Sequence, residues 1–404
     1  MPPECLAPEY VGSLFDVPIP MSVGDWVPDR PDHLNDWIQE MLKDIDKDGC
    51  PITHPAVLEF KNDIESDPEL FMGFHRIFEN VPERDPLGRL QVKDYLTMLS
   101  LFQRFMGDAP SWNPRFLVFL PFTTVLQWPM SMSNGFTILI NRRVNDHFRK
   151  IFAVWLKFLA SSQSNYVLHE GCDGWLSPEA MENMPKFKET FVCDPGEPHW
   201  GFTSWNHFFA RELRPGARPP SNPDDDRIIT SACESKFLRK AFSVTTRDQF
   251  WMKNQPYSLV HMLNNDPLAS SFVGGTVYQA FLSPYYYHRW HSPVEGTVVK
   301  TQGQQPFLSH VATRALIFIQ ARNPNIGLMC FIGVGMVEVS TCDITVEPGQ
   351  VVKKGQEIGT LHFGGSTHCL VFGPQVKLEF LNSTNEVIPA QLLDCPIDRV
   401  EAHL

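Results

Sequence analysis

The sequence predicts an α+β fold in which a helical N-terminal domain precedes a β-rich domain. Apolar residues follow a helical period up to about residue 200 and a period of two further along the chain. Between these regions, the stretch from Arg211 to Arg227 contains four prolines and three consecutive aspartates, which exclude regular structure. We therefore divide the chain into an extended arm at 1–31, a helical domain at 32–200 and a second domain at 201–404.

The N-terminal half is assigned from proline content and helical periodicity. The first 31 residues contain seven prolines and no helical period, which predicts an extended arm. Apolar residues from Leu34 to Ile45 then share one helical face, and Gly49 is a natural stop. The stretch from Phe148 to Leu159 predicts a second strong helix by the same period. The apolar run around Pro121 is too short to span a membrane, so we assign it to the core.

The C-terminal half alternates apolar and polar residues in short runs. Strands are predicted at 296–300, 315–321, 328–342 and 376–380, each bounded by turn residues. Turn glycines at 349, 355 and 359 separate further short strands. This rhythm indicates tight hairpins that fold into a small barrel or sandwich.

Composition excludes several classes of function. The 404-residue chain has a formal net charge of -12, which repels a nucleic-acid backbone and gives no attraction to an anionic membrane. Its nine cysteines are scattered without a C-x-x-C pair, a pattern typical of reduced thiols. The first residues lack the basic and apolar regions of a signal peptide, so we expect a cytoplasmic protein. No pattern predicts a metal site.

Two histidines three residues apart, His288 and His291, lie in "YYYHRWH" between strand-like stretches. In extended structure this spacing turns the two side chains to opposite faces, and a zinc site would need ligands that the neighbourhood lacks. Taken alone, the pair predicts one satisfied core histidine and one partly exposed histidine.

Ser366 follows a pair of glycines near the end of the chain. A nucleophile elbow, G-x-S-x-G, would require glycine at the position of His368, so an ordinary serine hydrolase is excluded. Taken alone, Gly364 and Gly365 predict a β-bulge or a tight hairpin.

Three motifs taken together change this interpretation. "SWNHFFARELRPGARP" from Ser204, "FLSPYYYHRWHSPVEGTVV" from Phe281 and "FGGST" from Phe363 resemble, in order and spacing, the phosphatidylserine decarboxylase family. The resemblance covers roughly residues 201–389. The helical half is similar to the amino-terminal domain of the soluble fungal branch, which includes the L-tryptophan decarboxylase of psilocybin biosynthesis.

The resemblance implies that residues 201–404 form a pyruvoyl-dependent decarboxylase domain that cuts itself between Gly365 and Ser366. Ser366 attacks the preceding carbonyl, the chain is released by elimination, and residue 366 becomes a covalent pyruvoyl group that replaces pyridoxal phosphate. By resemblance, His291 is the base, oriented by Glu234 of "SACES", where membrane-type members have aspartate. His288 is expected to assist the substrate carboxylate or the proton transfer.

The motifs imply an α-amino acid head group, and the substrate side chain is a separate inference. The absence of an anchor and the similarity to the fungal branch favour a free aromatic amino acid, with L-tryptophan giving tryptamine and CO2 in secondary metabolism. We expect no stable membrane insertion. After self-cleavage, the C-terminal chain is expected to stay bound to the rest of the protein. Formation of homo-oligomers is left open. Two alternatives also stay open: a soluble phosphatidylserine decarboxylase making phosphatidylethanolamine, and a non-catalytic lipoyl-like carrier at Lys353 and Lys354.

Overall fold

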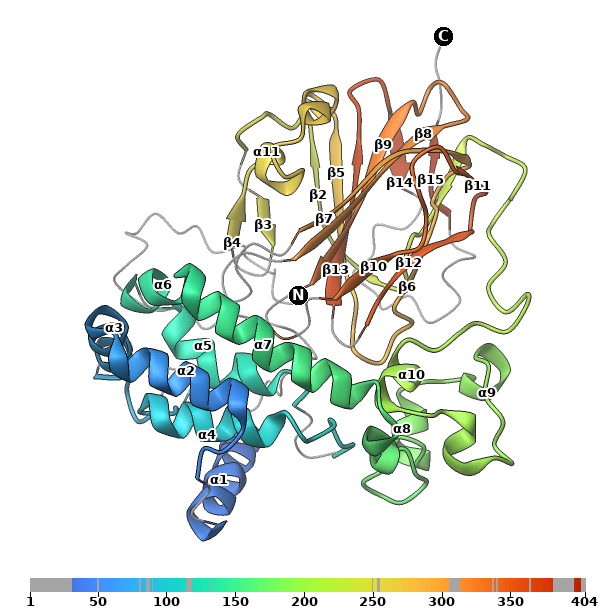
Figure 1. The fold of residues 1–404 in the computed structure, drawn as a ribbon. Helices are drawn as coiled ribbons and strands as arrows, with labels where there is room; N and C mark the ends of the chain where they lie inside the picture. The colour runs from blue at the N-terminus through green and yellow to red at the C-terminus, as the bar shows by residue number, and fades with distance from the viewer. Residues whose placement is uncertain are drawn as a thin grey trace, which may run out of the picture.

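The computed structural model separates a helical part from a β-rich part, as Figure 1 shows. It describes residues 31–48, 51–79, 81–84, 88, 90–113, 118–131, 133–248, 250–252, 255–304, 313–335, 338, 341–362, 365–380 and 396–400. For Gly365 and Ser366 only the backbone is described. The predicted arm lies outside these residues except for Pro31, which begins the first helix.

The helical part is built mainly from amphipathic helices, and their connections differ widely in length. Their bounds are α1 (Pro31–Asp48), α2 (Pro55–Ser66), α3 (Pro68–Glu79), α4 (Tyr95–Phe105), α5 (Pro121–Ser131), α6 (Ser133–Leu139), α7 (Arg142–Leu159), α8 (Pro178–Glu182), α9 (Phe187–Thr190) and α10 (Trp205–Phe209). Helices α1 and α7 confirm the two periodic stretches. Pro121 begins α5 instead of breaking it, because the first helical position needs no backbone N–H. No described helix has the length and apolar character required to cross a bilayer.

Aromatic side chains dominate the core of the helical part. Phe60, Phe102, Phe122, Phe148 and Trp155 are all fully or almost fully buried there. Burial of such side chains contributes about 1.5–3 kcal/mol each, so this core is a main source of stability. The same cluster continues to Tyr287, a residue of the β-rich part. The two parts therefore share one packed boundary.

The β-rich part contains short strands in mostly antiparallel sheets. Their bounds are β1 (Ile228–Thr230), β2 (Lys236–Phe242), β3 (Phe250–Met252), β4 (Gln255–Tyr257), β5 (Thr276–Phe281), β6 (Arg289–His291), β7 (Gly296–Gln304), β8 (Arg314–Ala321), β9 (Leu328–Gly335), β10 (Cys342–Ile344), β11 (Val351–Val352), β12 (Glu357–Leu361), β13 (Gly365–Phe372), β14 (Leu378–Phe380) and β15 (Pro396–Val400), with helix α11 (Leu259–Met262) between β4 and β5. The main sheet has the order β11-β7-β8-β9-β13-β5-β2, and a smaller sheet has the order β10-β12-β6.

The predicted α+β class is confirmed, and the sheet arrangement selects between the two expected β architectures. One face of β13 places Leu370 and Phe372 in a core shared with Trp290 of the smaller sheet, as in a sandwich. The opposite face places Cys369 and Val371 in a second core beside α11. In the described strands the main sheet ends at β11 and β2, so it is open and does not close into a barrel.

One strand is shorter than its pattern predicts. The run 328–342 reads as a continuous strand, but β9 ends at Gly335 and β10 begins at Cys342. Between them, Glu338 lies in a turn and is fully buried against Thr123 of α5. The chain leaves the sheet here to reach the helical part, which a local apolar pattern cannot reveal.

Candidate active site

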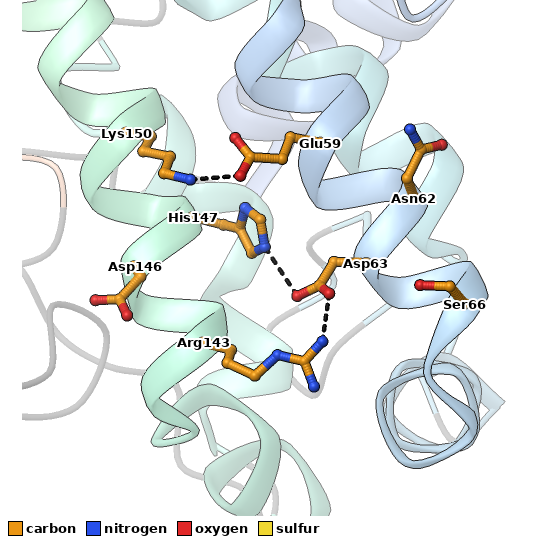
Figure 2. A pocket seen from close by; sticks show the side chains of 8 residues that line it. All are labelled: Glu59, Asn62, Asp63, Ser66, Arg143, Asp146, His147 and Lys150. Atoms are coloured by element: carbon orange, nitrogen blue, oxygen red, sulfur yellow. Dashed lines mark hydrogen bonds and ion pairs between the residues drawn. The ribbon is translucent and has the colours of Figure 1, made fainter.

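An open polar cleft of about 460 Å³ lies between α2 and α7 (Figure 2). Its charged side chains pair with one another: Lys150 Nζ lies 2.5 Å from a Glu59 carboxylate oxygen, and His147 Nε2 lies 3.0 Å from Asp63. Arg143 also binds Asp63. None of the site residues predicted from the sequence lines this cleft, so the chemistry has to be sought elsewhere.

The two predicted histidines lie at the boundary between the parts, on a segment that is fixed by backbone hydrogen bonds. Strand β6, which ends at His291, pairs with β12. The Leu361 N–H donates to the His288 carbonyl over 3.0 Å. Because β12 leads directly toward β13, these bonds tie the histidine segment to the chain that approaches Ser366.

His291 has both ring nitrogens engaged. Nδ1 lies 2.8 Å from the Gly355 carbonyl, and Nε2 lies 2.9 Å from the Tyr287 hydroxyl. A carbonyl can only accept, so Nδ1 carries the proton and donates, and Nε2 accepts from Tyr287. Burial lowers the pKa of His291, partly offset by the Gly355 hydrogen bond. The ring is therefore held as a neutral base with its basic nitrogen at Nε2.

His288 differs from its neighbour in its surroundings. Its ring stacks on Phe209 with centroids 4.0 Å apart, and the residue is 0% exposed. Burial, followed by the charge of Arg211, lowers the pKa of His288 well below its ordinary value. His291 is also buried, at 7% exposure, so the expectation of one partly exposed histidine from the isolated pair is wrong. Phe209 of the helical part covers the His288 ring, whereas Tyr287 and Gly355 of the β-rich part contact the His291 ring.

Arg211 clamps the chain just before the histidines. Its guanidinium donates to the carbonyls of Tyr285 and Tyr286 over 2.7 and 3.0 Å and lies 4.4 Å from the Phe191 ring centroid. The residue is 1% exposed, and burial lowers the pKa of Arg211 to about 10. It keeps its charge at neutral pH and fixes the tyrosine carbonyls by charge-assisted hydrogen bonds.

Glu234 is buried in the loop between β1 and β2, next to the histidine strand. The neighbouring Ala232 carbonyl accepts from the His291 N–H over 2.8 Å. The Glu234 carboxylate itself lies 3.8 Å from the Arg218 guanidinium, whereas the hydrogen bonds of the His291 ring go to Tyr287 and Gly355. Burial raises the pKa of Glu234, opposed by Arg218. A backbone hydrogen bond therefore holds this loop next to His291, whereas the Glu234 carboxylate lies near Arg218.

The predicted cut lies at the beginning of β13. Gly365 pairs with Gly335 of β9, and Thr367 pairs with the adjacent Val334, so the register shifts at Ser366. A shift of this kind leaves one residue outside the ladder and bends the strand. Glycine on both strands allows the backbones to approach without side-chain conflict. The irregularity that the glycines predicted is present at the proposed scission point.

Two contributors to the site were missed in the sequence. The Tyr287 hydroxyl contacts His291, a contact that was not predicted from the sequence. Gly355 had been assigned only to a turn, yet its carbonyl sets the tautomer of the base. Its φ of +78° explains why glycine stands there. No local pattern signalled the first, because residues four apart in extended structure lie about 13 Å apart, and the second depends on folding of a hairpin.

Comparison with known proteins identifies family models that match both parts of the chain. Residues 54–184 and 205–391 match two family models, both described as phosphatidylserine decarboxylase. The first lies in the helical part, and the second contains both histidines and Ser366. In the described residues, no three His, Cys, Asp or Glu side chains gather closely enough to hold a metal ion.

Named relatives fall into two groups. The chain is 41% identical to decarboxylase iboD of Amanita muscaria, over 65% of this chain and 86% of that protein. It is 32% identical to L-tryptophan decarboxylase of Psilocybe cubensis, over 82% and 83% of the two chains. It is 30% identical to phosphatidylserine decarboxylase proenzyme 3 of Schizosaccharomyces pombe, but over 50% of this chain and only 22% of that protein. The matches to decarboxylase iboD and to L-tryptophan decarboxylase are therefore too long to be confined to the β-rich part.

Proposed function

Because the chain belongs to the phosphatidylserine decarboxylase family and is a decarboxylase, we propose that it cuts itself between Gly365 and Ser366 and decarboxylates a free aromatic L-amino acid. L-Tryptophan is the proposed substrate and tryptamine the product, with a cytoplasmic location as part of the same proposal. The observation that carries the proposal is His291, whose Nδ1–H is fixed on Gly355 so that Nε2 is the basic nitrogen. A neutral imidazole beside a serine is the usual requirement for activating a hydroxyl.

In the proposed cleavage, His291 removes the Ser366 proton while the serine oxygen attacks the Gly365 carbonyl carbon. The C–N bond between Gly365 and Ser366 breaks, the leaving Ser366 amine takes the proton back from His291, and an ester forms. Elimination then releases the upstream chain as a carboxylate, and hydrolysis of the remaining dehydroalanine releases ammonia and leaves a pyruvoyl group. The Tyr287 hydroxyl donates a hydrogen bond to His291 Nε2, so this bond has to break before Nε2 can take the serine proton. Burial raises the pKa of Tyr287, so its hydroxyl stays protonated and acts as a neutral partner.

We propose that residue 366 carries the pyruvoyl group in the processed protein. The group supplies an electron-accepting carbonyl for loss of CO2. In support, this chain has a strand irregularity at Ser366 and a buried His288 that stacks on Phe209, on the segment bonded to β12. A water-poor site strengthens electrostatic interactions and limits side reactions. We propose that His288 positions the substrate carboxylate or moves a proton at its ring nitrogen.

Glu234 remains part of the proposed site, although its carboxylate lies near an arginine and makes no described hydrogen bond to the His291 ring. Its carboxylate lies near Arg218, and Arg211 also acts on it electrostatically. Both arginines come from the motif that begins at Ser204. We propose that Glu234 acts on His291 through the loop backbone, since Ala232 binds the His291 N–H. Glu234→Gln should therefore slow cleavage less than loss of His291 does.

The substrate proposal is supported by the extent of similarity. The relative named L-tryptophan decarboxylase matches through both parts, whereas the phosphatidylserine decarboxylase of Schizosaccharomyces pombe matches over half of this chain. The carrier alternative is disfavoured at Lys354, because its Nζ donates to the carbonyls of Asn222 and Asp225 over 2.9 and 2.6 Å and the residue is buried. A carrier lysine has to be accessible for modification.

A substrate panel tests the proposal. Purified protein is incubated separately with L-tryptophan, L-phenylalanine, L-tyrosine and phosphatidylserine vesicles, and amine formation is measured by mass spectrometry. We expect tryptamine to form fastest, and a Ser366→Ala variant to form none. Faster formation of phosphatidylethanolamine would support the lipid alternative and contradict the proposed substrate.

A further inference from the structure

We propose that Glu338 is a positioning residue for self-cleavage, through which helix α5 of the helical part holds the segment beside Gly365 in place. The inference rests on the proposed cut between Gly365 and Ser366. It assigns a role to the helical part that neither the motifs nor the family resemblance provides.

The contact joins residues that are far apart in the sequence. The Thr123 N–H donates to one carboxylate oxygen of Glu338 over 3.0 Å, and the Thr123 hydroxyl donates to the other over 2.5 Å. Thr123 lies in the first turn of α5, where backbone N–H groups lack partners within the helix. A carboxylate at this end also interacts favourably with the helix dipole. Glu338 therefore caps a helix of the other part of the molecule.

Glu338 is close in sequence to the strand residue that faces the cut. It follows Gly335 by three residues, and Gly335 pairs with Gly365 across β9 and β13. Three residues span at most about 11 Å, so fixing Glu338 restricts where the end of β9 can lie. Cleavage needs the Ser366 hydroxyl and the Gly365 carbonyl in a near-attack arrangement, and small displacements are costly to such reactions. The contact between Glu338 and Thr123 therefore restricts the position of the backbone at Gly365 and Ser366.

The beginning of α5 also borders the histidine segment. Phe119, two residues before the helix, packs edge-on against Tyr285 with ring centroids 6.0 Å apart. Tyr285 is held in turn by Arg211 through its carbonyl. One short stretch of the helical part therefore contacts both the chain that carries His288 and His291 and the chain that follows β9.

A carboxyl group is an unusual choice for a purely structural join. Glu338 and Thr123 are 0% and 2% exposed, and burying a charged group is unfavourable unless it is well paired. Burial raises the pKa of Glu338 to about 7, opposed by the hydrogen bonds from Thr123. Apolar side chains could join the parts at lower cost, whereas directed hydrogen bonds define one position of the segment.

The test compares two neighbouring threonines of α5. Thr123→Val removes the hydroxyl that binds Glu338 and keeps the side-chain shape. Thr124→Val is the matched control, because the Thr124 hydroxyl binds the Leu120 carbonyl near its own helix over 2.7 Å. Cleavage is followed on denaturing gels after synthesis of the full chain. The thermal midpoint of each variant is measured in a Ser366→Ala background, where all precursors stay intact.

We expect Thr123→Val to slow cleavage about tenfold, the effect of losing one hydrogen bond to a buried carboxyl group. Thr123→Ser should restore the rate. Thr124→Val should cleave at the wild-type rate, although its thermal midpoint should be comparable to that of Thr123→Val. Wild-type cleavage in Thr123→Val, or equal slowing in Thr124→Val, would overturn the inference. A wild-type chain that stays uncut would instead overturn the proposed function, so the two failures are distinguishable.

Discussion

The cleft between α2 and α7 and the buried histidine site both gather titratable side chains, but they treat charge in opposite ways. In the cleft, the Lys150 hydrogen bond lowers the pKa of Glu59, and Arg143 of the cleft lowers the pKa of Asp67, which lies outside its lining. At the boundary between the parts, burial lowers the pKa of His288 and His291. Pairing favours charged forms in the cleft, whereas burial favours neutral forms at the histidines.

This difference shows why the open cleft is not the better candidate site. Solvated ion pairs contribute little to stability. A neutral histidine with a defined tautomer can take a proton, and its enclosed position limits competing water. Substitutions matched between the two regions should therefore have unequal effects.

The largest effect is expected from the proposed base. His291→Ala should slow self-cleavage by at least ~100-fold, because it removes general-base assistance. His147→Gln changes the histidine of the cleft and should leave cleavage unchanged. Fragment formation is measured by denaturing gel electrophoresis, and circular dichroism verifies folding. Equal losses in both variants would contradict the assignment of His291.

Arg211→Met should give the next largest effect, on stability. The substitution leaves the Tyr285 and Tyr286 carbonyls without their charged donor, at a cost of ~2–3 kcal/mol. Arg143→Met, in the cleft, removes a half-exposed partner and should have a much smaller effect. Urea unfolding in the Ser366→Ala background compares the two, and equal free-energy losses would argue against a special role for Arg211.

The pH dependence of cleavage should follow the lowered pKa of His291. A base with a lowered pKa stays neutral to lower pH, so the cleavage rate should persist through ~6.5, the ordinary histidine value, and fall only below it. Initial rates across this range provide the measurement. A midpoint at or above the ordinary value would show that His291 is not the titrating base.

Precursor stability should show a related pH effect. His288 is neutral in the folded chain, whereas the unfolded chain takes up a proton below ~6.5. Its contribution to stability is therefore complete above this pH and is lost as the pH falls. His288→Phe in the Ser366→Ala background should flatten the dependence measured by thermal unfolding. An unaltered slope would contradict a buried neutral His288.

The smallest effect is expected from Tyr287→Phe. The ring packing against Phe191 is kept, and only the hydroxyl that orients His291 is lost. A single neutral hydrogen bond contributes ~0.5–1.5 kcal/mol, so cleavage should slow several-fold. Rates as low as those of His291→Ala would mean that Tyr287 takes part in the reaction beyond orienting the ring.

Local patterns predicted those features that depend on neighbouring residues. Helix α7 and strands β7 and β8 follow from periodicity, because one turn or one pleat determines which side chain faces the core. The end of β9 could not be predicted in this way, since Glu338 leaves the sheet to meet Thr123, 215 residues away. The Gly355 carbonyl on His291 likewise depends on a contact across 64 residues. Long-range hydrogen bonds of single groups leave no period in the sequence.

Denaturing mass spectrometry of the purified protein tests the central claim most directly. We predict two chains, the smaller beginning with a pyruvoyl group at position 366, and one intact chain for Ser366→Ala. A wild-type preparation that remains a single 404-residue species with an unmodified Ser366 would contradict the account.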